Sequence, residues 1–241
     1  MSRLLVETRG PCSWRDRLTN PGLHWKRSCS AFETAISWET ASRSSSGLPA
    51  PIEQLLANGG FESPVLLLAV AEHQVDLPGG RAASQSDVWA MINTAAGVMS
   101  LTVEAKARET FGDEHLETWL IGTSEQSAIN RKARWEYVRA HLPVADSYLC
   151  VRYQILHRCA AAVIEAKRLR CPNAAFVVQA FETPGKGKPD VNFAEYEAFS
   201  AALKLPASRG SLSTTSIDGI SLSIGWIDCP VATDAAVAAC A

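Results

Sequence analysis

Three side chains in the middle of the chain have the types and spacing for metal-dependent phosphodiester chemistry. Asp87 lies before a plausible reversal at Ala95-Ala96, and Glu104 and Lys106 lie after it. If the two alanines form the turn, residues whose numbers sum to 191 face each other across an antiparallel hairpin. Asp87 and Glu104 have this sum, and Lys106 shares the face of Glu104. The pattern therefore predicts two carboxylates and an ammonium group on one patch.

Such a patch has the layout of a Mg²⁺ site, for which Mn²⁺ can substitute. Two carboxylates that oppose each other across a sheet are unfavourable unless a cation lies between them. The prediction depends on the hairpin register. Ala95-Ala96 is not a favoured turn pair, and a three-residue loop would move Asp87 to the other face.

The acid-x-lysine spelling by itself identifies no site, because the chain contains it twice as Glu-Ala-Lys. The second copy, Glu165 to Lys167, closes a segment with helical periodicity and is expected to be a solvated helix end. The first copy follows a run rich in β-forming residues and has Asp87 on the preceding strand. This context favours Glu104 and Lys106 as the functional pair.

Length and composition predict one compact α/β domain. The 241 residues are 47% apolar and 20% charged, which can support a core. No apolar run approaches the length of a membrane span, and no secretory leader is recognised at the start. The seven cysteines are scattered and include no Cys-x-x-Cys. This usage favours the cytoplasm over a disulfide framework or a zinc cluster.

The net charge of −2 argues against a strong nucleic-acid binder, but the positive charges are unevenly distributed. Residues 1–27 hold six Arg or Lys against two acids, and four basic residues crowd the segment 131–139. Either cluster alone is more simply an ordinary solvated face. Carboxylates of a metal site also lower the net charge of nucleases, so near-neutrality does not exclude one.

Hydrophobic periodicity and punctuation residues predict an order of elements that begins after an irregular arm over 1–29. A single domain is expected over 30–230, and an Ala-rich tail over 231–241. Ser30 and Glu33 have the spacing of a helix-capping box. The expected elements are, in chain order, a helix over Ser30–Ala41, a helix over Pro51–Asn58, a strand over Ser63–Val75, a hairpin over Val88–Lys106, a helix over Ser127–His141, a helix over Tyr153–Arg170, a strand over Ala174–Phe181, a helix over Phe193–Leu203 and a strand over Ile220–Ile227.

This order and the residues Asp87 and Glu104-Ala105-Lys106 resemble the PD-(D/E)XK, or restriction-endonuclease-like, nuclease superfamily. The resemblance covers roughly residues 30–182. It implies an αβββαβ core, a central mixed sheet flanked by helices, with the Asp on the second strand and the (D/E)xK on the third. Phrases such as Ser86-Asp87-Val88-Trp89 and Arg152-Tyr153-Gln154 also resemble an uncharacterised bacterial family of that superfamily. Ser86 departs from the Pro of the superfamily name, which the chemistry of the carboxylate tolerates.

The resemblance implies a role for each site residue. Asp87, Glu104 and the carbonyl of Ala105 would ligate Mg²⁺. Lys106 would orient or deprotonate the attacking water and offset charge on the phosphorus. Gln154, near the start of the following helix, would position substrate or water.

Glu39 on the first helix is a candidate auxiliary metal ligand or base. Glu53 competes with it for that role, and an ordinary exposed helix acid is the other interpretation of Glu39.

The sequence and the resemblance together predict a Mg²⁺-dependent nuclease that hydrolyses DNA phosphodiester bonds. The protein is expected to act in the cytoplasm, with DNA as its partner and without binding a membrane. A homodimer would suit the cutting of both strands. The alternative is a catalytically inactive nuclease fold used as a binding or assembly module. Hydrolysis or transfer of another phosphate compound also stays open, because a metal patch does not identify its substrate.

Overall fold

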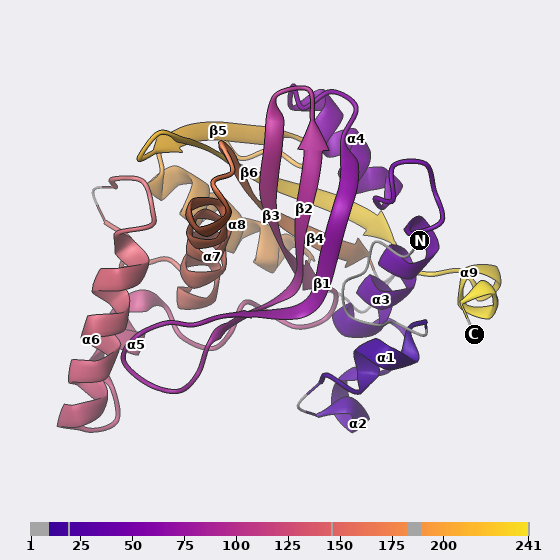
Figure 1. The fold of residues 1–241 in the computed structure, drawn as a ribbon. Coiled ribbons are helices and arrows are strands. Elements are labelled where there is room, and N and C mark those ends of the chain that lie inside the picture. The colour runs from indigo at the N-terminus through magenta and orange to yellow at the C-terminus, as the bar shows by residue number, and fades with distance from the viewer. Residues whose placement is uncertain (1–9, 19, 146, 183–188, 241) are drawn as a thin grey trace.

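A mixed sheet of six strands forms the centre of the molecule (Figure 1). The computed structural model describes residues 10–18, 20–145, 147–182 and 189–240. The strand order is β1-β2-β3-β4-β6-β5. Strands β1, β2 and β3 are antiparallel neighbours, β4 and β6 run parallel to β3, and β5 is an antiparallel edge. The strands are β1 (Val65–Val75), β2 (Ser84–Thr94), β3 (Gly97–Lys106), β4 (Asn173–Glu182), β5 (Leu212–Ile217) and β6 (Ile220–Pro230).

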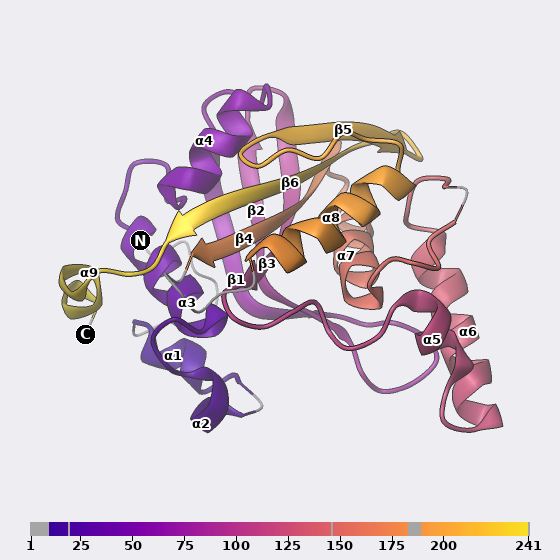
Figure 2. The same cartoon turned by 180° about the vertical axis from the view of Figure 1, so that it is seen from behind.

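Helices cover both faces of this sheet (Figures 1 and 2). Apolar side chains of α3 and α4 pack with β1, β2 and β3 on one face, and those of α7 and α8 pack with β4 and β6 on the other. Helices α5 and α6 lie beyond α7. The helices are α1 (Cys12–Arg15), α2 (Pro21–His24), α3 (Ser30–Ala41), α4 (Ala50–Asn58), α5 (Leu116–Ile121), α6 (Glu125–Arg139), α7 (Tyr153–Leu169), α8 (Pro189–Ala202) and α9 (Asp234–Ala239).

The expected α/β class is confirmed. The series α3, β1, β2, β3, α7, β4 has the order helix, three strands, helix, strand, with α5 and α6 inserted after the third strand. The parallel pair β3 and β4 is joined through α7, as a parallel connection requires a crossover. The carboxyl end of β3 and the start of α7 thereby come to the same end of the sheet.

The hairpin between β2 and β3 has the predicted register, with Thr94 opposite Gly97 and Val88 opposite Val103. The alanines of the turn do not take a positive φ, because Gly97 takes it instead, at +100°. The Thr94 hydroxyl donates to the Gly97 carbonyl at 2.8 Å and accepts from the Ala96 amide at 3.2 Å. A glycine after the turn therefore makes an unfavoured Ala-Ala pair compatible with a two-residue loop.

Two local features differ from the sequence-based expectations. The arm contains two short helices in its described part, and Trp14 of α1 is buried in the core beneath α3. The capping box is wrong in detail, since the Glu33 carboxylate accepts from the amides of Ser28 and Ala232. The Ala-rich tail agrees with expectation, since a weak helix was one of its two expected states: it contains the short helix α9, whose first turn is capped by Thr233.

Strand β5 was not predicted, although its signal is present in the sequence. Asp218 and Gly219 join it to β6, and both have positive φ, at +50° and +78°. Asp-Gly between apolar alternating segments is a strong signal for a tight hairpin. The edge strand could therefore have been found from the residues alone.

Candidate functional site

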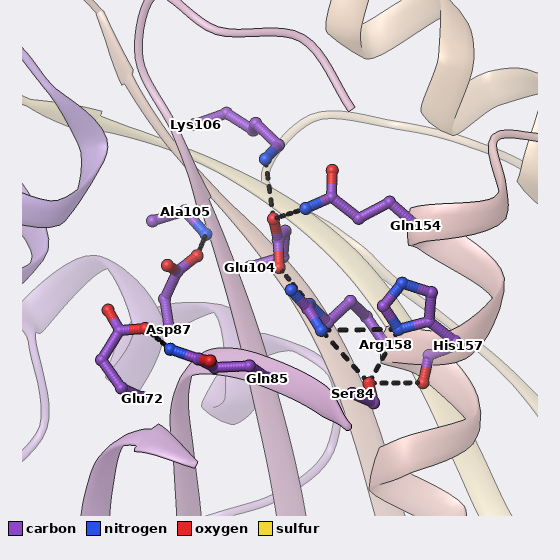
Figure 3. Close-up of polar contacts among 10 residues, drawn as sticks. All are labelled: Glu72, Ser84, Gln85, Asp87, Glu104, Ala105, Lys106, Gln154, His157 and Arg158. Carbon is purple, nitrogen blue, oxygen red and sulfur yellow. Dashed lines mark hydrogen bonds and ion pairs between the residues drawn. The ribbon is translucent and has the colours of Figure 1, made fainter. Parts of the chain in front are cut away.

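The candidate site lies where β2 and β3 separate, at the end of the hairpin away from its turn. The regular ladder ends at Val88 and Val103, one pair before Asp87 and Glu104. The Ala105 amide donates to the Asp87 carboxylate at 2.7 Å (Figure 3). The side chain of Asp87 thus accepts the hydrogen bond that a backbone carbonyl accepts in a regular ladder. Asp87, Glu104 and Lys106 lie at one end of the sheet, as predicted, but the predicted shared face of the two carboxylates is wrong. Asp87 and Glu104 form no ladder pair, and their carboxylates lie on opposite sides of β3 (Figure 3).

Glu104 is the centre of a buried network of charges (Figure 3). One carboxylate oxygen accepts from the Lys106 ammonium at 2.7 Å and from the Gln154 amide at 2.8 Å. The other accepts from the Arg158 guanidinium at 2.8 Å. Glu104 is 2% exposed and Lys106 is 4% exposed. Two strand residues and two residues one turn apart on α7 thus meet at one carboxylate.

The charges of this network support one another. Burial acts to raise the pKa of Glu104, but Lys106 and Arg158 together hold it below its usual value. Burial acts to lower the pKa of Lys106, and Glu104 and Asp87 overcome that effect and raise it. Glu104 is therefore an anion and Lys106 a cation at neutral pH.

Glu72 on β1 belongs to the same site, although it was not predicted. Its neighbours Ala71 and His73 pair with Val88 and Ser86, which puts Glu72 opposite Asp87 in the register. Its φ is +52°, a conformation that costs free energy for a residue with a side chain. The Glu72 carboxylate accepts from the Gln85 amide at 2.7 Å. Three carboxylates, one from each antiparallel strand, thus lie at this end of the sheet.

The site disfavours the ionised forms of Asp87 and Glu72. Burial, Glu104 and Glu72 raise the pKa of Asp87 well above its usual value, against the effects of Lys106 and of the Ala105 amide. Burial raises the pKa of Glu72 to about 6, with a smaller contribution from Glu104. In Figure 3 these two carboxyl groups lie on one side of β3, while Glu104 and its cationic partners lie on the other.

A cavity of about 310 Å³ joins these groups. Its wall includes all the strand residues of the proposed metal site, together with side chains from α2, α3, α7 and the segment after β3. These residues are His24, Ser30, Glu72, Gln85, Asp87, Glu104, Ala105, Lys106, Glu109, Gln154 and Arg158. Within it the Gln154 side-chain oxygen is buried without a hydrogen-bond partner. That oxygen is available to a ligand or to water.

A second layer of polar contacts holds Arg158 in place (Figure 3). Arg158 donates to the Ser84 hydroxyl at 3.2 Å, and this hydroxyl lies 2.8 Å from Nδ1 of His157. Burial and the neighbouring Arg158 and Arg134 lower the pKa of His157 well below its usual value. The imidazole is therefore neutral at neutral pH. The contact of Arg158 with Glu104 was not predicted from the sequence.

Glu39 does not line the cavity. Its buried carboxylate accepts from the indole of Trp14 at 2.8 Å, which explains its position on α3 as a structural contact. Its competitor Glu53 accepts from the Ser46 hydroxyl at 2.6 Å and also lies outside the cavity. Neither residue contributes to the site as the structure describes it.

The second Glu-Ala-Lys is on α7, as expected, but its acid is buried rather than solvated. Glu165 is 4% exposed and pairs with Arg168 at 2.5 Å and with His73 at 3.5 Å. Lys167 turns outward to Asp218 at 2.7 Å. The acid and the lysine of this copy therefore have different partners, whereas Glu104 and Lys106 bind each other.

The fold and this site define a class: an α/β domain with a charged cavity at one end of a mixed sheet. The chain belongs to the family described as a domain of unknown function (DUF6946), whose model matches residues 7–230. The comparisons with curated proteins and with solved structures gave no match. In the part of the chain that the structure describes, no helix has the length and hydropathy of a membrane span.

Proposed function

We propose that this domain is a Mg²⁺-dependent nuclease of the PD-(D/E)XK type that hydrolyses DNA phosphodiester bonds. The observation that carries the proposal is the hairpin register, which brings Asp87 and Glu104-Ala105-Lys106 to one cavity. The order of α3, β1, β2, β3, α7 and β4 agrees with the core of that superfamily. Gln154, a further predicted site residue, donates to Glu104, whereas the predicted Glu39 lies outside the cavity.

The donor chemistry of the cavity fits a hard cation. Glu72, Asp87 and Glu104 supply carboxylate oxygens, which Mg²⁺ and Mn²⁺ prefer. The raised pKa of Asp87 reflects a site where a further positive charge would be stabilising. The ligands are not preassembled, because no group of three or more His, Cys, Asp or Glu among the described residues is arranged to hold a metal. Both oxygens of Glu104 are already hydrogen bonded.

Each protein residue then has a role that its contacts support. Asp87, Glu104 and the Ala105 carbonyl would hold the cation, which when bound supplies Lewis-acid polarisation of a phosphoryl oxygen. Lys106 stays protonated, since Glu104 and Asp87 raise its pKa. It therefore offsets charge on the phosphoryl group and orients water rather than removing a proton. The unpartnered oxygen of Gln154 accepts from water or substrate.

A second candidate function is the inactive nuclease fold, and the saturation of Glu104 favours it. Lys106, Gln154 and Arg158 occupy both carboxylate oxygens, which is the arrangement of a structural ion network. In that case the domain would bind or assemble without cutting. The two candidate functions differ in whether a metal cation can displace the hydrogen-bond partners of Glu104 and bind its carboxylate.

The test is cleavage of linear, supercoiled and branched DNA with Mg²⁺ or Mn²⁺, comparing the wild type with Lys106→Ala and Lys167→Ala. Lys167 is the matched control because it stands in the second Glu-Ala-Lys copy, outside the cavity. We expect the wild type and Lys167→Ala to cut alike and Lys106→Ala to lose at least about a hundredfold in rate. Equal cutting by all three proteins would refute the assignment of Lys106.

A second measurement tests metal binding separately from DNA cleavage. Without DNA, Mg²⁺ should raise the melting temperature of the wild type and of Lys167→Ala, and should not raise that of Asp87→Ala. An absence of cleavage together with no stabilisation by either metal would favour the binding module. Native mass measurement in the same buffer would show whether the active species is a homodimer.

A further inference from the structure

A second polar cavity, of about 460 Å³, lies between α6 and the connection from β1 to β2. Figure 1 shows this connection running away from the sheet towards α5 and α6. Arginines from both segments line the cavity, namely Arg81, Arg131 and Arg134. Among the described residues, none that lines the acidic cavity also lines this one. It is therefore a separate place on the molecule.

Two glycines allow the connection to approach α6 closely. A Cβ atom at Gly79 would lie 2.0 Å from the Asn130 carbonyl, and one at Gly80 would lie 3.3 Å from the Arg134 guanidinium. Both glycines have positive φ, at +77° and +142°. The Arg134 Nε donates to the Pro78 carbonyl at 2.9 Å and fixes the connection on the helix. This packing brings Arg81 beside the arginines of α6.

Two of the three arginines of this cavity, Arg81 and Arg134, have no ion pair with another described residue. Arg134 is only 8% exposed, and no ion pair among the described residues involves it or Arg81. Arg131 meets Glu114 only at 3.5 Å and otherwise donates to the Trp119 carbonyl. Its guanidinium lies 5.2 Å from the centre of the Trp119 ring. Arg134 is thus a buried cation without an ion pair among the described residues, and Arg131 and the exposed Arg81 add positive charge beside it. A bound anion would compensate a buried charge of this kind.

We propose that this cavity binds a phosphate group. A guanidinium offers parallel N–H donors that match two oxygens of a phosphate, and three arginines suit a multiply charged oxyanion. The first turn of the 15-residue helix α6 also lines the cavity, through Ser124, Gln126 and Ser127. The positive end of the helix dipole adds to the field of the arginines. The proposal does not depend on the proposed nuclease activity.

The phosphate could come from a free phosphorylated small molecule or from the backbone of a nucleic acid. Helix α7 connects the two cavities and bears on this choice. Its Tyr153 stacks on Trp119 of the arginine cavity, with ring centres 3.6 Å apart. The next residue, Gln154, and Arg158 line the acidic cavity. A backbone phosphate held by the arginines would thus belong to a strand running beside the acidic site.

The experiment measures binding in EDTA, so that no metal-dependent cutting contributes. Inorganic phosphate is titrated by calorimetry, and a fluorescent single-stranded oligonucleotide by anisotropy at several salt concentrations. The proteins are the wild type, Arg81→Gln, Arg131→Gln and Lys132→Gln. Lys132 is the matched control, because it removes one charge from α6 next to Arg131 but does not line the cavity. Both test residues are more exposed than Arg134, which favours folding of the variants.

We expect Arg81→Gln and Arg131→Gln each to weaken binding about tenfold, and Lys132→Gln less than about twofold. Selective loss of inorganic phosphate alone would identify a free phosphorylated compound as the source. Selective loss of oligonucleotide, with the salt dependence of log K reduced by about one, would identify a backbone phosphate. Equal effects of Arg131→Gln and Lys132→Gln on both ligands, or no binding of either by the wild type, would overturn the proposal.

Discussion

The two polar cavities of this protein handle charge in opposite ways. In the acidic cavity, Glu104 sits among Lys106, Gln154 and Arg158, and each cation contacts a carboxylate oxygen within 2.8 Å. In the arginine cavity, the buried Arg134 donates a hydrogen bond to the Pro78 carbonyl. Among the described residues it forms no ion pair with a carboxylate. Buried charge in the first is largely compensated from within the chain, whereas buried charge in the second is not.

This difference separates stability from binding. A network that satisfies itself holds strands and helix together, and removing one member leaves the others unpaired. A cluster of cations with few carboxylate partners contributes little electrostatic stability to the folded chain. Its counter-charge comes from a bound ligand. The acidic cavity combines both cases, because Glu72 and Asp87 lie beside the saturated Glu104 and have raised pKa values.

The largest expected effect is on the stability of Glu104→Ala. This change leaves the buried Lys106 and Arg158 without their shared counter-charge, since their side chains are only 5% and 12% exposed. We expect a loss of about 3–5 kcal/mol in the free energy of unfolding, measured by urea denaturation. Glu53→Ala serves as a control on an acid outside the cavity. A loss below about 1 kcal/mol would show that the network is not structural.

An intermediate effect is expected in the pH dependence of Glu72→Gln. Glu72 has a pKa of about 6 in the folded protein against 4.5 for a free side chain, so the folded state binds this proton more tightly. Glu72 should therefore contribute a gain in stability, on the order of 1 kcal/mol, to the wild type as the pH falls from about 7 to about 5. Glu72→Gln should lose most of that gain.

Thermal melts of both proteins across this range provide the measurement. Asp87 adds to the gain with the same sign, because its pKa is also raised. Glu104 acts in the opposite direction only at lower pH, since its pKa is lowered. The buried His157 also acts in the opposite direction, and within this range, because its lowered pKa lets the unfolded chain bind a proton that the folded protein does not. An identical change of melting temperature from pH 7 to pH 5 in the wild type and in Glu72→Gln would contradict the raised pKa of Glu72.

The smallest expected effect is on the stability of Arg131→Gln without ligand. Its contact with Glu114 is long and partly exposed, at 3.5 Å. We expect a change within about 0.5 kcal/mol in urea denaturation, although phosphate binding falls about tenfold. A large destabilisation together with unchanged binding would assign the arginine cavity a structural role and remove the contrast between the two cavities.

Much of the fold could be predicted because its elements carry local signals. The helix over Ser30–Ala41 was predicted at the bounds of α3, and β1, β4 and α7 were predicted to within a few residues. The hairpin register was also predicted correctly, since the turn position determines every pair that follows it. The edge strand β5 was missed, although Asp218-Gly219 is a turn signal that the sequence contains.

The candidate site was predictable only in part. Asp87, Glu104 and Lys106 follow from strand periodicity, and Gln154 followed from a resemblance. Glu72 could not be found in that way, because its role depends on how β1 pairs with β2 and on a backbone conformation that breaks the strand pattern. Glu39 had a suggestive place on the first helix, but its contact with Trp14 comes from an arm whose packing no local pattern indicated.

The sequence by itself determined the α/β class, the order of the main elements and the register of the hairpin that carries Asp87 and Glu104. These depend on periodicity and turn chemistry, which act over a few residues at a time. Only the tertiary structure decided which charges are neutralised. Arg158 reaches Glu104 across 54 positions of the chain, while Arg81 and Arg134 are brought together without an acid. Electrostatic energy depends on distance and burial in space, and neither is written in the local pattern of residues.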